Sequence, residues 1–459
     1  MKRISPVLAL TFILIFLVTS RILVLGKEGE WVWKYHKISF WWRAFFPFLV
    51  SSLFILLIYL LKRFPLSRRM VILLLFLFTF LIQISFQYFT PLGVSQNVVV
   101  LSMPWISGYF TEAMVFRGGR EYFQKYPDSV TYRHVKLRPP LGMLMTRGII
   151  KLFYSSPSLT RLFLKVTSAT IFDSRRSFSF LESKMGWKLA DYEKASLIFL
   201  GIFLTLLCSA GIIPLYLWLL REGENSLIFS AFYAFIPSLL LFSPSFDFIL
   251  PLFVALILYT ISFRNRNIFW SGVFTAIGVL FSLSLLLVFI FAVVYMLMDR
   301  EKRRYILLYL GGFLALILFF YLLTGFSLLR YMLRLTPAFT EEGRRIFLEV
   351  KGERSYGFWV LYDPVEFFLF AGIPLSYLFF CGWRKTPPRF KYVFTGVFLF
   401  LNFSGVSLSE VGRLWSFLYP FLFLPALNSR ERYLLPLLSL EFLQSLFFKA
   451  SLDVFSLFP

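Results

Sequence analysis

The residues best suited to chemistry lie in one polar stretch of the chain, between residues 90 and 194. It contains the carboxylates Glu112 and Asp128 and the imidazole of His134, which are groups that can exchange protons with a substrate. Basic side chains lie close to them in the sequence, and such groups bind phosphate. These basic residues are Arg117, Arg120, Lys136 and Arg138. We therefore place the chemistry of the protein in this stretch.

The composition indicates what must surround the polar stretch. Of the 459 residues, 58% are hydrophobic and 61 are phenylalanine, which is more apolar surface than a soluble core of this size can bury. We therefore expect an all-α, polytopic membrane protein. The formal net charge of +23 arises from short basic clusters between apolar runs. That arrangement is typical of the positive-inside rule, so we expect membrane lipids as partners and no nucleic acid.

Apolar runs long enough to cross a bilayer define the expected architecture. A window of roughly 19 residues gives about thirteen spans. Their expected bounds are 6–25, 44–62, 70–89, 195–220, 226–242, 247–263, 268–282, 283–298, 304–324, 364–382, 391–405, 411–428 and 431–448. Between Leu141 and Phe172, Pro157 interrupts the run and basic residues recur at four-residue spacing. This pattern favours amphipathic helices on the outer membrane surface, with a transmembrane hairpin as the alternative.

The charges of the loops predict the orientation of the chain. With the N-terminus in the cytoplasm, the expected inside loops are basic, apart from residues 221–225, which hold one arginine and two glutamates. The large loop 90–194, the segment 325–363 and the turns 243–247 and 404–410 then share the outer side. We expect a multi-pass protein of the plasma (inner) membrane whose active side is extracytoplasmic.

Five short motifs fall on this expected outer side. They are Trp105–Ala113 (WISGYFTEA), Tyr126–Asp128 (YPD), Arg138–Gly142 (RPPLG), Pro237–Asp247 (PSLLLFSPSFD) and Ser404–Trp415 (SGVSLSEVGRLW). Their order resembles the GT-C superfamily of integral-membrane glycosyltransferases, which includes the dolichyl-phosphate-mannose protein mannosyltransferases and the lipid A aminoarabinose transferases. In many of these enzymes a His-Pro-Pro string closes the first large outer loop, where this chain has Arg138-Pro139-Pro140.

The resemblance covers roughly residues 70–430 and suggests three parts. Residues 1–69 form an N-terminal transmembrane hairpin that precedes the matching region. Residues 70–430 form a GT-C-like transmembrane core, which includes the large outer loop and the outer segment 325–363. Residues 431–459 form the final span and the C-terminal tail.

The resemblance implies transfer of a sugar from a polyprenyl-phosphate carrier to a lipid, glycan or protein acceptor. Glu112 is then the expected proton acceptor, Asp128 is the second catalytic candidate, and a single displacement would invert the anomeric carbon. The lipid phosphate that leaves requires cationic side chains. The expected ones are Arg117, Arg120, Lys136, Arg138 and Arg413. No cofactor is assigned, and a divalent metal has no support from the sequence.

Three further residues are site candidates, and each has a structural alternative. His134 could be a surface residue, and Asp247 could sit at the membrane edge with its charge in water. Glu410 could form a structural ion pair with Arg413, three residues later. Glu112 could also stabilise the start of a short helix. It is the first acid after the span that ends near Phe89, whereas GT-C enzymes usually carry an aspartate close to that span.

Two other functional classes fit the same pattern. One is a lipid-linked glycan ligase or polymerase, which would share the lipid-linked donor and the large outer loop. The other is a non-catalytic membrane transporter or assembly protein of glycolipid export. A transporter would need ionisable groups deep in several spans, whereas the ionisable residues here crowd one expected face. This distribution favours an enzyme.

Overall fold

The chain forms a helical bundle with one hydrophobic core. The computed structural model describes residues 5–36, 41–116, 118–335, 352, 354–429 and 431–455. Helices make up 75% of the structure, and the short strands that it describes form two antiparallel two-stranded sheets. The expected mainly helical fold is confirmed. The largest cluster of buried apolar side chains runs from Val7 to Phe455, so the three parts expected from the sequence share one core.

Several helices of the bundle are long and apolar enough to cross a bilayer. Within the described residues five pass this test. They are η1 with α2 (Trp41–Ala44, Phe45–Arg63), α3 (Arg68–Tyr88), α12 with α13 (Asp191–Ala210, Ile212–Glu222), α20 (Ile306–Thr324) and α28 (Leu434–Ser451). They differ in burial, since 72% of the apolar window of α28 is buried but only 22% of that of α20. Thus α28 belongs to the core, whereas α20 presents an apolar surface suited to lipid.

The expected count of thirteen spans is not confirmed. Many of the other expected spans are helices of fewer than about 18 residues, or helices broken by proline, and a full crossing needs roughly 20 residues. These helices are α1 (Ser5–Thr19), α14 (Ser226–Tyr233), α15 (Pro237–Leu241), η3 with α16 (Phe246–Ile249, Leu250–Ile261), α17 (Ile268–Phe281), α18 (Leu285–Leu297), α25 (Pro388–Ser404), and η4 with α27 (Ser416–Leu418, Tyr419–Leu427). The expected span 364–382 is a bent pair, α23 (Tyr356–Ala371) and α24 (Ile373–Trp383), whose axes differ by 108°.

The bend between α23 and α24 is stabilised by polar side chains of α28. Gln444 Oε1 accepts a hydrogen bond from the N–H of Ile373 at 2.8 Å, and Glu441 Oε2 accepts one from the N–H of Leu375 at 3.1 Å. These donors belong to the first turn of α24 and have no partner within the helix. Gly372 permits the bend, since its φ is +102° and a Cβ would overlap the Glu441 carboxylate. Glu441 and Gln444, which had no expected role, therefore cap a broken helix.

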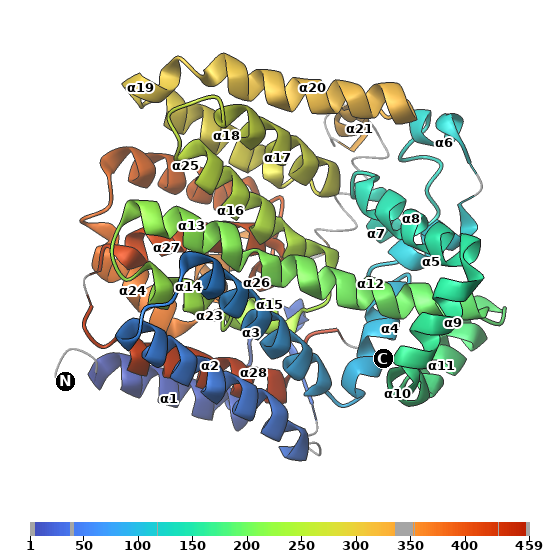
Figure 1. The fold of residues 1–459 in the computed structure, drawn as a ribbon, viewed down its shortest axis with the longest axis horizontal. Coiled ribbons are helices and arrows are strands. Elements are labelled where there is room, and N and C mark those ends of the chain that lie inside the picture. The colour runs from blue at the N-terminus through green and yellow to red at the C-terminus, as the bar shows by residue number, and fades with distance from the viewer. Residues whose placement is uncertain are drawn as a thin grey trace.

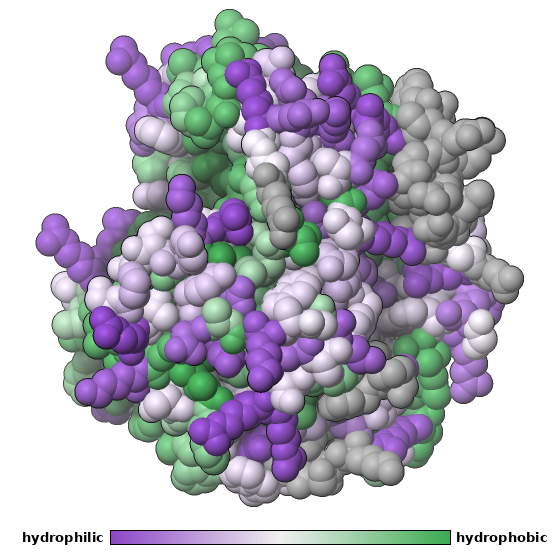
Figure 2. Space-filling view, turned by 90° about the vertical axis from the view of Figure 1, so that its right-hand side faces the viewer, coloured by the Kyte–Doolittle hydropathy of each residue, from purple (hydrophilic) through white to green (hydrophobic). Residues whose placement is uncertain are grey.

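Short helices cover one end of the bundle. They lie at the right in Figure 1, at the opposite end from α19 (Arg300–Arg303), one of the basic segments expected inside. These helices are η2 (Gly93–Ser95), α4 (Gln96–Ser102), α5 (Tyr109–Val115), α6 (Arg120–Gln124), α7 (Arg133–Lys136), α8 (Leu141–Ser155), α9 (Pro157–Val166), α10 (Ser168–Asp173), α11 (Arg175–Met185) and α21 (Leu328–Leu335). Hydrophilic residues gather on this end, as Figure 2 shows. We call it the polar cap.

The polar cap agrees in part with the expected outer face. Residues 141–172 form separate helices of at most 15 residues, and these are not among the candidate spans, which favours surface helices over a hairpin. The outer segment after Gly325 packs on the large loop, because Tyr331 Oη donates to the carbonyl of Lys136 at 3.2 Å. Much of the remaining expected outer segment, residues 336–351 and 353, lies outside the described residues.

Strands bring the segment after the first helix and the C-terminal tail together. Strands β1 (Gly26–Lys27) and β2 (Trp31–Val32) form a small hairpin. Strand β3 (Lys34–Tyr35) pairs with β4 (Leu452–Asp453), which follows α28. The segment after the first helix and the C-terminal tail are therefore neighbours, although more than 400 residues separate them.

Candidate functional site

Two adjoining cavities open in the polar cap. The larger has a volume of about 170 Å³ and the smaller about 40 Å³. The larger is lined by Trp31, Val32, Trp33, Lys34, Trp105, Ile106, His134, Glu410, Arg413, Asp453, Val454 and Phe455. The smaller is lined by Val100, Ile106, Ser107, Tyr109, His134, Arg138, Ser245, Phe246, Asp247, Arg413 and Phe455. Four residues line both, namely Ile106, His134, Arg413 and Phe455.

Close packing of three segments forms the smaller cavity. The rings of Tyr109 and Phe246 lie 4.0 Å apart, centroid to centroid. Gly142, in the first turn of α8, permits this contact, because a Cβ there would lie 2.8 Å from the Tyr109 ring and 3.2 Å from the Phe246 ring. The glycine of the Arg138–Gly142 motif thus brings the motif at residue 105 and the turn before α16 to one place.

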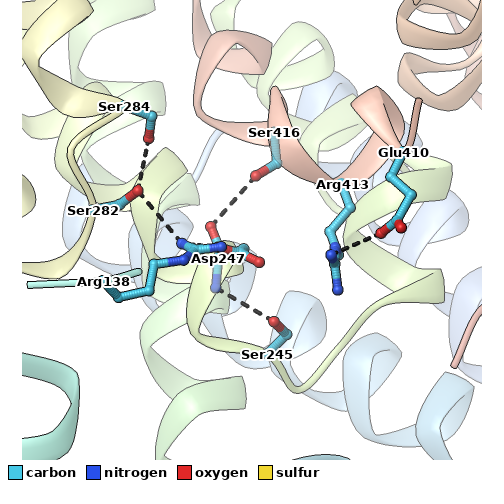
Figure 3. A network of polar contacts seen from close by, with 8 residues as sticks. All are labelled: Arg138, Ser245, Asp247, Ser282, Ser284, Glu410, Arg413 and Ser416. Carbon is cyan, nitrogen blue, oxygen red and sulfur yellow. Dashed lines mark hydrogen bonds and ion pairs between the residues drawn. The ribbon is translucent and has the colours of Figure 1, made fainter. Parts of the chain in front are cut away.

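An ion pair between Arg138 and Asp247 lies at the smaller cavity. Burial disfavours the charged form of Arg138, but the adjacent Asp247 carboxylate outweighs this effect and raises the pKa of the guanidinium. The Ser245 hydroxyl accepts a hydrogen bond from the N–H of Asp247 at 3.4 Å, and the Arg138 guanidinium donates to the Ser282 hydroxyl at the same distance. Figure 3 shows these contacts, with the Arg413 guanidinium on the other side of Asp247. One carboxylate therefore lies between two arginines.

A second ion pair, between Arg413 and Glu410, lies in the larger cavity, with Nη2 and Oε2 2.7 Å apart. Arg413 belongs to α26 (Val411–Leu414), and Glu410 belongs to the turn before that helix. Ser409 and Glu410 both have positive φ there, 69° and 53°, which is unfavourable for residues with a Cβ. The surrounding structure must therefore hold this turn in place.

Two buried carboxylates of α23 hold the strained turn. Asp363 Oδ1 accepts a hydrogen bond from the N–H of Ser409 at 3.2 Å, and Glu366 Oε1 accepts one from the N–H of Gly412 at 3.1 Å. Both side chains have no exposed surface. Sequence reasoning missed them, because their partners are backbone groups some 46 residues away.

His134 lies in the wall shared by the two cavities. Burial lowers its pKa below the ordinary value of 6.5, and the positive charges of Arg413 and Arg138 lower it further, against the opposite effect of Glu410. The imidazole is therefore mainly neutral at pH 7 and can accept a proton. The other polar residue of the shared wall is Arg413, whose guanidinium carries N–H donors and no acceptor.

The structure brings together half of the residues predicted from the sequence. His134, Arg138 and Arg413 line the cavities, as do Asp247 and Glu410. Glu112 lines neither cavity and has 1% of its surface exposed. Its carboxylate accepts hydrogen bonds from Tyr122 Oη at 2.8 Å and from the N–H groups of Thr131 and Tyr132, both at 3.0 Å. Glu112 thus holds the large loop together, and its carboxylate is not placed at either cavity to act as the proton acceptor expected from the sequence.

Three further predicted residues, Asp128, Arg120 and Lys136, line neither cavity. Asp128 forms a half-exposed ion pair with Arg334 of α21. Arg120 packs against Gly325, and Lys136 lies in α7, where its carbonyl accepts from Tyr331. Arg117 lies outside the described residues. Proximity in the sequence to His134 and Arg138 was therefore a poor guide to proximity in space.

Sequence reasoning missed the cavity wall formed by the segment after the first helix and the C-terminal tail. This wall comprises Trp31, Trp33 and Lys34 together with Asp453 and Phe455. The expected orientation already placed both segments on the outer side, but no motif linked them. Their proximity depends on the pairing of β3 with β4.

Metal ligands are not evident in the described part of the chain. No group of three or more His, Cys, Asp or Glu side chains there is arranged to hold a metal ion. The polar side chains of the two cavities instead include two Arg–carboxylate pairs and an imidazole. Such a set can bind an anion and accept a proton.

Comparison with models of protein families, with curated proteins and with solved structures gives no match to this chain. The resemblance to GT-C glycosyltransferases therefore stays a prediction.

Proposed function

We propose that the protein is a membrane glycosyltransferase that moves a sugar from a polyprenyl-phosphate carrier to a hydroxyl acceptor. One observation carries the proposal: Arg138 and Arg413 converge on the smaller cavity, at the polar end of an apolar helical bundle. The lining of that cavity holds two guanidinium groups against one carboxylate, Asp247, while Arg413 is also paired with Glu410 of the adjoining cavity. Such a cavity suits the phosphate of a lipid whose hydrocarbon chain stays among apolar helices.

The two arginines have distinct roles in this proposal. Arg138 is oriented by Asp247 and Ser282, so its direction is set before a ligand binds. Arg413 lies in α26, directly after the strained turn, and is paired with Glu410 of that turn. Together they would hold the phosphate and stabilise the negative charge that develops on it as the sugar leaves.

The transfer step uses His134 as the proton acceptor. The acceptor oxygen forms a bond to the anomeric carbon, while the bond from that carbon to the phosphate oxygen breaks and its electron pair stays on the polyprenyl phosphate. The hydroxyl proton passes to the neutral imidazole. A group that serves both substrates must touch both cavities, and among the four shared lining residues His134 is the one able to accept a proton. A single displacement of this kind inverts the anomeric carbon.

The proposed location is the plasma membrane, with the polar cap outside the cytoplasm. The basic segment α19 lies at the opposite end of the bundle from the polar cap, as the positive-inside rule requires for this orientation. The exposed apolar surface of α20, where Leu307 is 80% and Leu323 is 68% exposed, would face lipid.

The test is a transfer assay in proteoliposomes. A panel of short-chain polyprenyl-phosphate hexoses and pentoses is incubated with the protein and a membrane glycan extract, and the release of polyprenyl phosphate is measured. We expect release with at least one donor, and a loss of about 100-fold or more in His134→Gln and in Arg413→Gln, typical of removing a proton acceptor or a charge-stabilising donor. Release at the normal rate in both variants would refute the proposal.

A further inference from the structure

We propose that the larger cavity binds a neutral carbohydrate, and that this carbohydrate is the acceptor of the transfer reaction. The inference rests on the proposed function, which it extends by naming the class of acceptor. Its basis is the lining of the larger cavity, to which the segment after the first helix and the C-terminal tail both contribute.

The charge of the larger cavity argues against an anionic ligand. Its charged lining residues are Lys34 and Arg413, which are positive, and Glu410 and Asp453, which are negative, so their formal charges sum to zero. His134 adds no charge at pH 7, since burial and the adjacent arginines lower its pKa. Arg138 lines only the smaller cavity and the three indole rings line only the larger one, so the two cavities suit different ligands.

The polar groups of the larger cavity suit hydroxyls. Carboxylates accept hydrogen bonds in several directions, and ammonium and guanidinium groups donate them. Glu410 gives one contact to Arg413 and, being a carboxylate with about four acceptor positions, retains capacity for others. A sugar hydroxyl both donates and accepts, so it can use both kinds of group in one small volume.

The apolar lining of the same cavity suits the C–H face of a sugar ring. Trp31, Trp33 and Trp105 contribute to it, and Trp31 and Trp33 stand edge to face with their ring centroids 4.4 Å apart. Indole rings offer a large, rigid apolar surface at little entropic cost. Trp105 is 49% exposed although it is large and apolar, so it has surface to offer a ligand.

The two ligands would meet at the shared wall. A carbohydrate in the larger cavity contacts His134 and Arg413, and both residues also line the smaller cavity. A hydroxyl of the bound carbohydrate can therefore reach the imidazole while the donor phosphate lies against the arginines. Lys34 of β3 and Asp453 of β4 line the larger cavity and not the smaller one, so they can contact the carbohydrate and not the donor phosphate.

Binding of the full-length protein in nanodiscs to a glycan array tests this inference. The array carries neutral, sulfated, phosphorylated and carboxylated glycans. We expect retention of neutral glycans, with binding reduced about tenfold or more in Trp105→Ala and in Asp453→Asn. Trp270→Ala is the matched control, because Trp270 is 53% exposed at the start of α17 and lines neither cavity, and it should bind like the unchanged protein.

Three results would overturn the inference: no glycan retained, a preference for anionic glycans, or equal binding by the two cavity variants and the control. Native mass spectrometry with undecaprenyl phosphate separates this failure from failure of the proposed function. If polyprenyl phosphate binds but no neutral glycan does, the carbohydrate assignment is wrong and the donor cavity stands. If polyprenyl phosphate does not bind either, the proposed function fails as well.

Discussion

Breaking the Arg138–Asp247 pair should destabilise the protein more than an exposed pair would. The two side chains are 23% and 10% exposed, and they are bonded to each other in the polar cap. Removing one partner of a buried pair costs about 3–5 kcal/mol, whereas exposed pairs contribute about 0–1 kcal/mol. Because Arg138 keeps some exposure, we expect Arg138→Gln to lower the free energy of unfolding by about 3 kcal/mol, the lower end of the range for buried pairs.

A double-mutant cycle measures the coupling free energy between Arg138 and Asp247. Arg138→Gln, Asp247→Asn and the double variant are unfolded by adding sodium dodecyl sulfate to mixed micelles. The loss in the double variant should be smaller than the sum of the two single losses by about 2 kcal/mol, because the second change removes a charge that is already unpaired. Lys125 and Glu121 are the matched control, an i,i+4 pair of the same cap whose side chains are 66% and 76% exposed. Equal coupling in the two pairs would refute the burial argument.

Three further predictions concern single residues. Burial and the adjacent arginines lower the pKa of His134 below 6.5, so its neutral form persists into mild acid. The transfer rate should therefore fall only below pH 6.5. A rate that already falls above pH 6.5, or a His134→Gln variant with the same decline in acid, would exclude His134 as the base. Gly372→Ala should lower the free energy of unfolding by about 2 kcal/mol or more, since a Cβ would overlap Glu441, and unchanged stability would contradict the bend. Glu112→Gln should cost about 1–3 kcal/mol of stability, because an amide cannot replace all the acceptor contacts with Tyr122 and the backbone; a folded Glu112→Gln variant with no transfer activity would return Glu112 to the mechanism.

Features that depend on local composition could be predicted from the sequence. The apolar runs gave the helical class, and Arg138–Gly142 was recognised as part of the site. Asp247 and Arg413 were also found, because each is an ionisable residue beside an apolar run at the expected outer end. A charged side chain in such a position needs a polar environment, so a charged residue there already indicates a polar site.

Features that depend on long-range contacts could not be predicted. Glu112 has a residue type and sequence neighbours that suit catalysis, yet its carboxylate accepts hydrogen bonds from backbone N–H groups about 20 residues later. Trp31 and Asp453 line the same cavity because β3, which follows Trp31 closely in the chain, pairs with β4, and this long-range pairing has no sequence signature. The expected span count also treated short and bent helices as full spans, because hydropathy reports the length of an apolar run and not its geometry.

Binding of a polyprenyl phosphate to the purified protein tests the central claim most directly. Native mass spectrometry would compare undecaprenyl phosphate with undecaprenol, which has the same chain without the phosphate. The account predicts saturable binding of the phosphate, at least tenfold weaker binding of the alcohol, and a similar loss in the Arg138→Gln/Arg413→Gln double variant. Equal binding of the phosphate and the alcohol, or undiminished binding by the double variant, would contradict it.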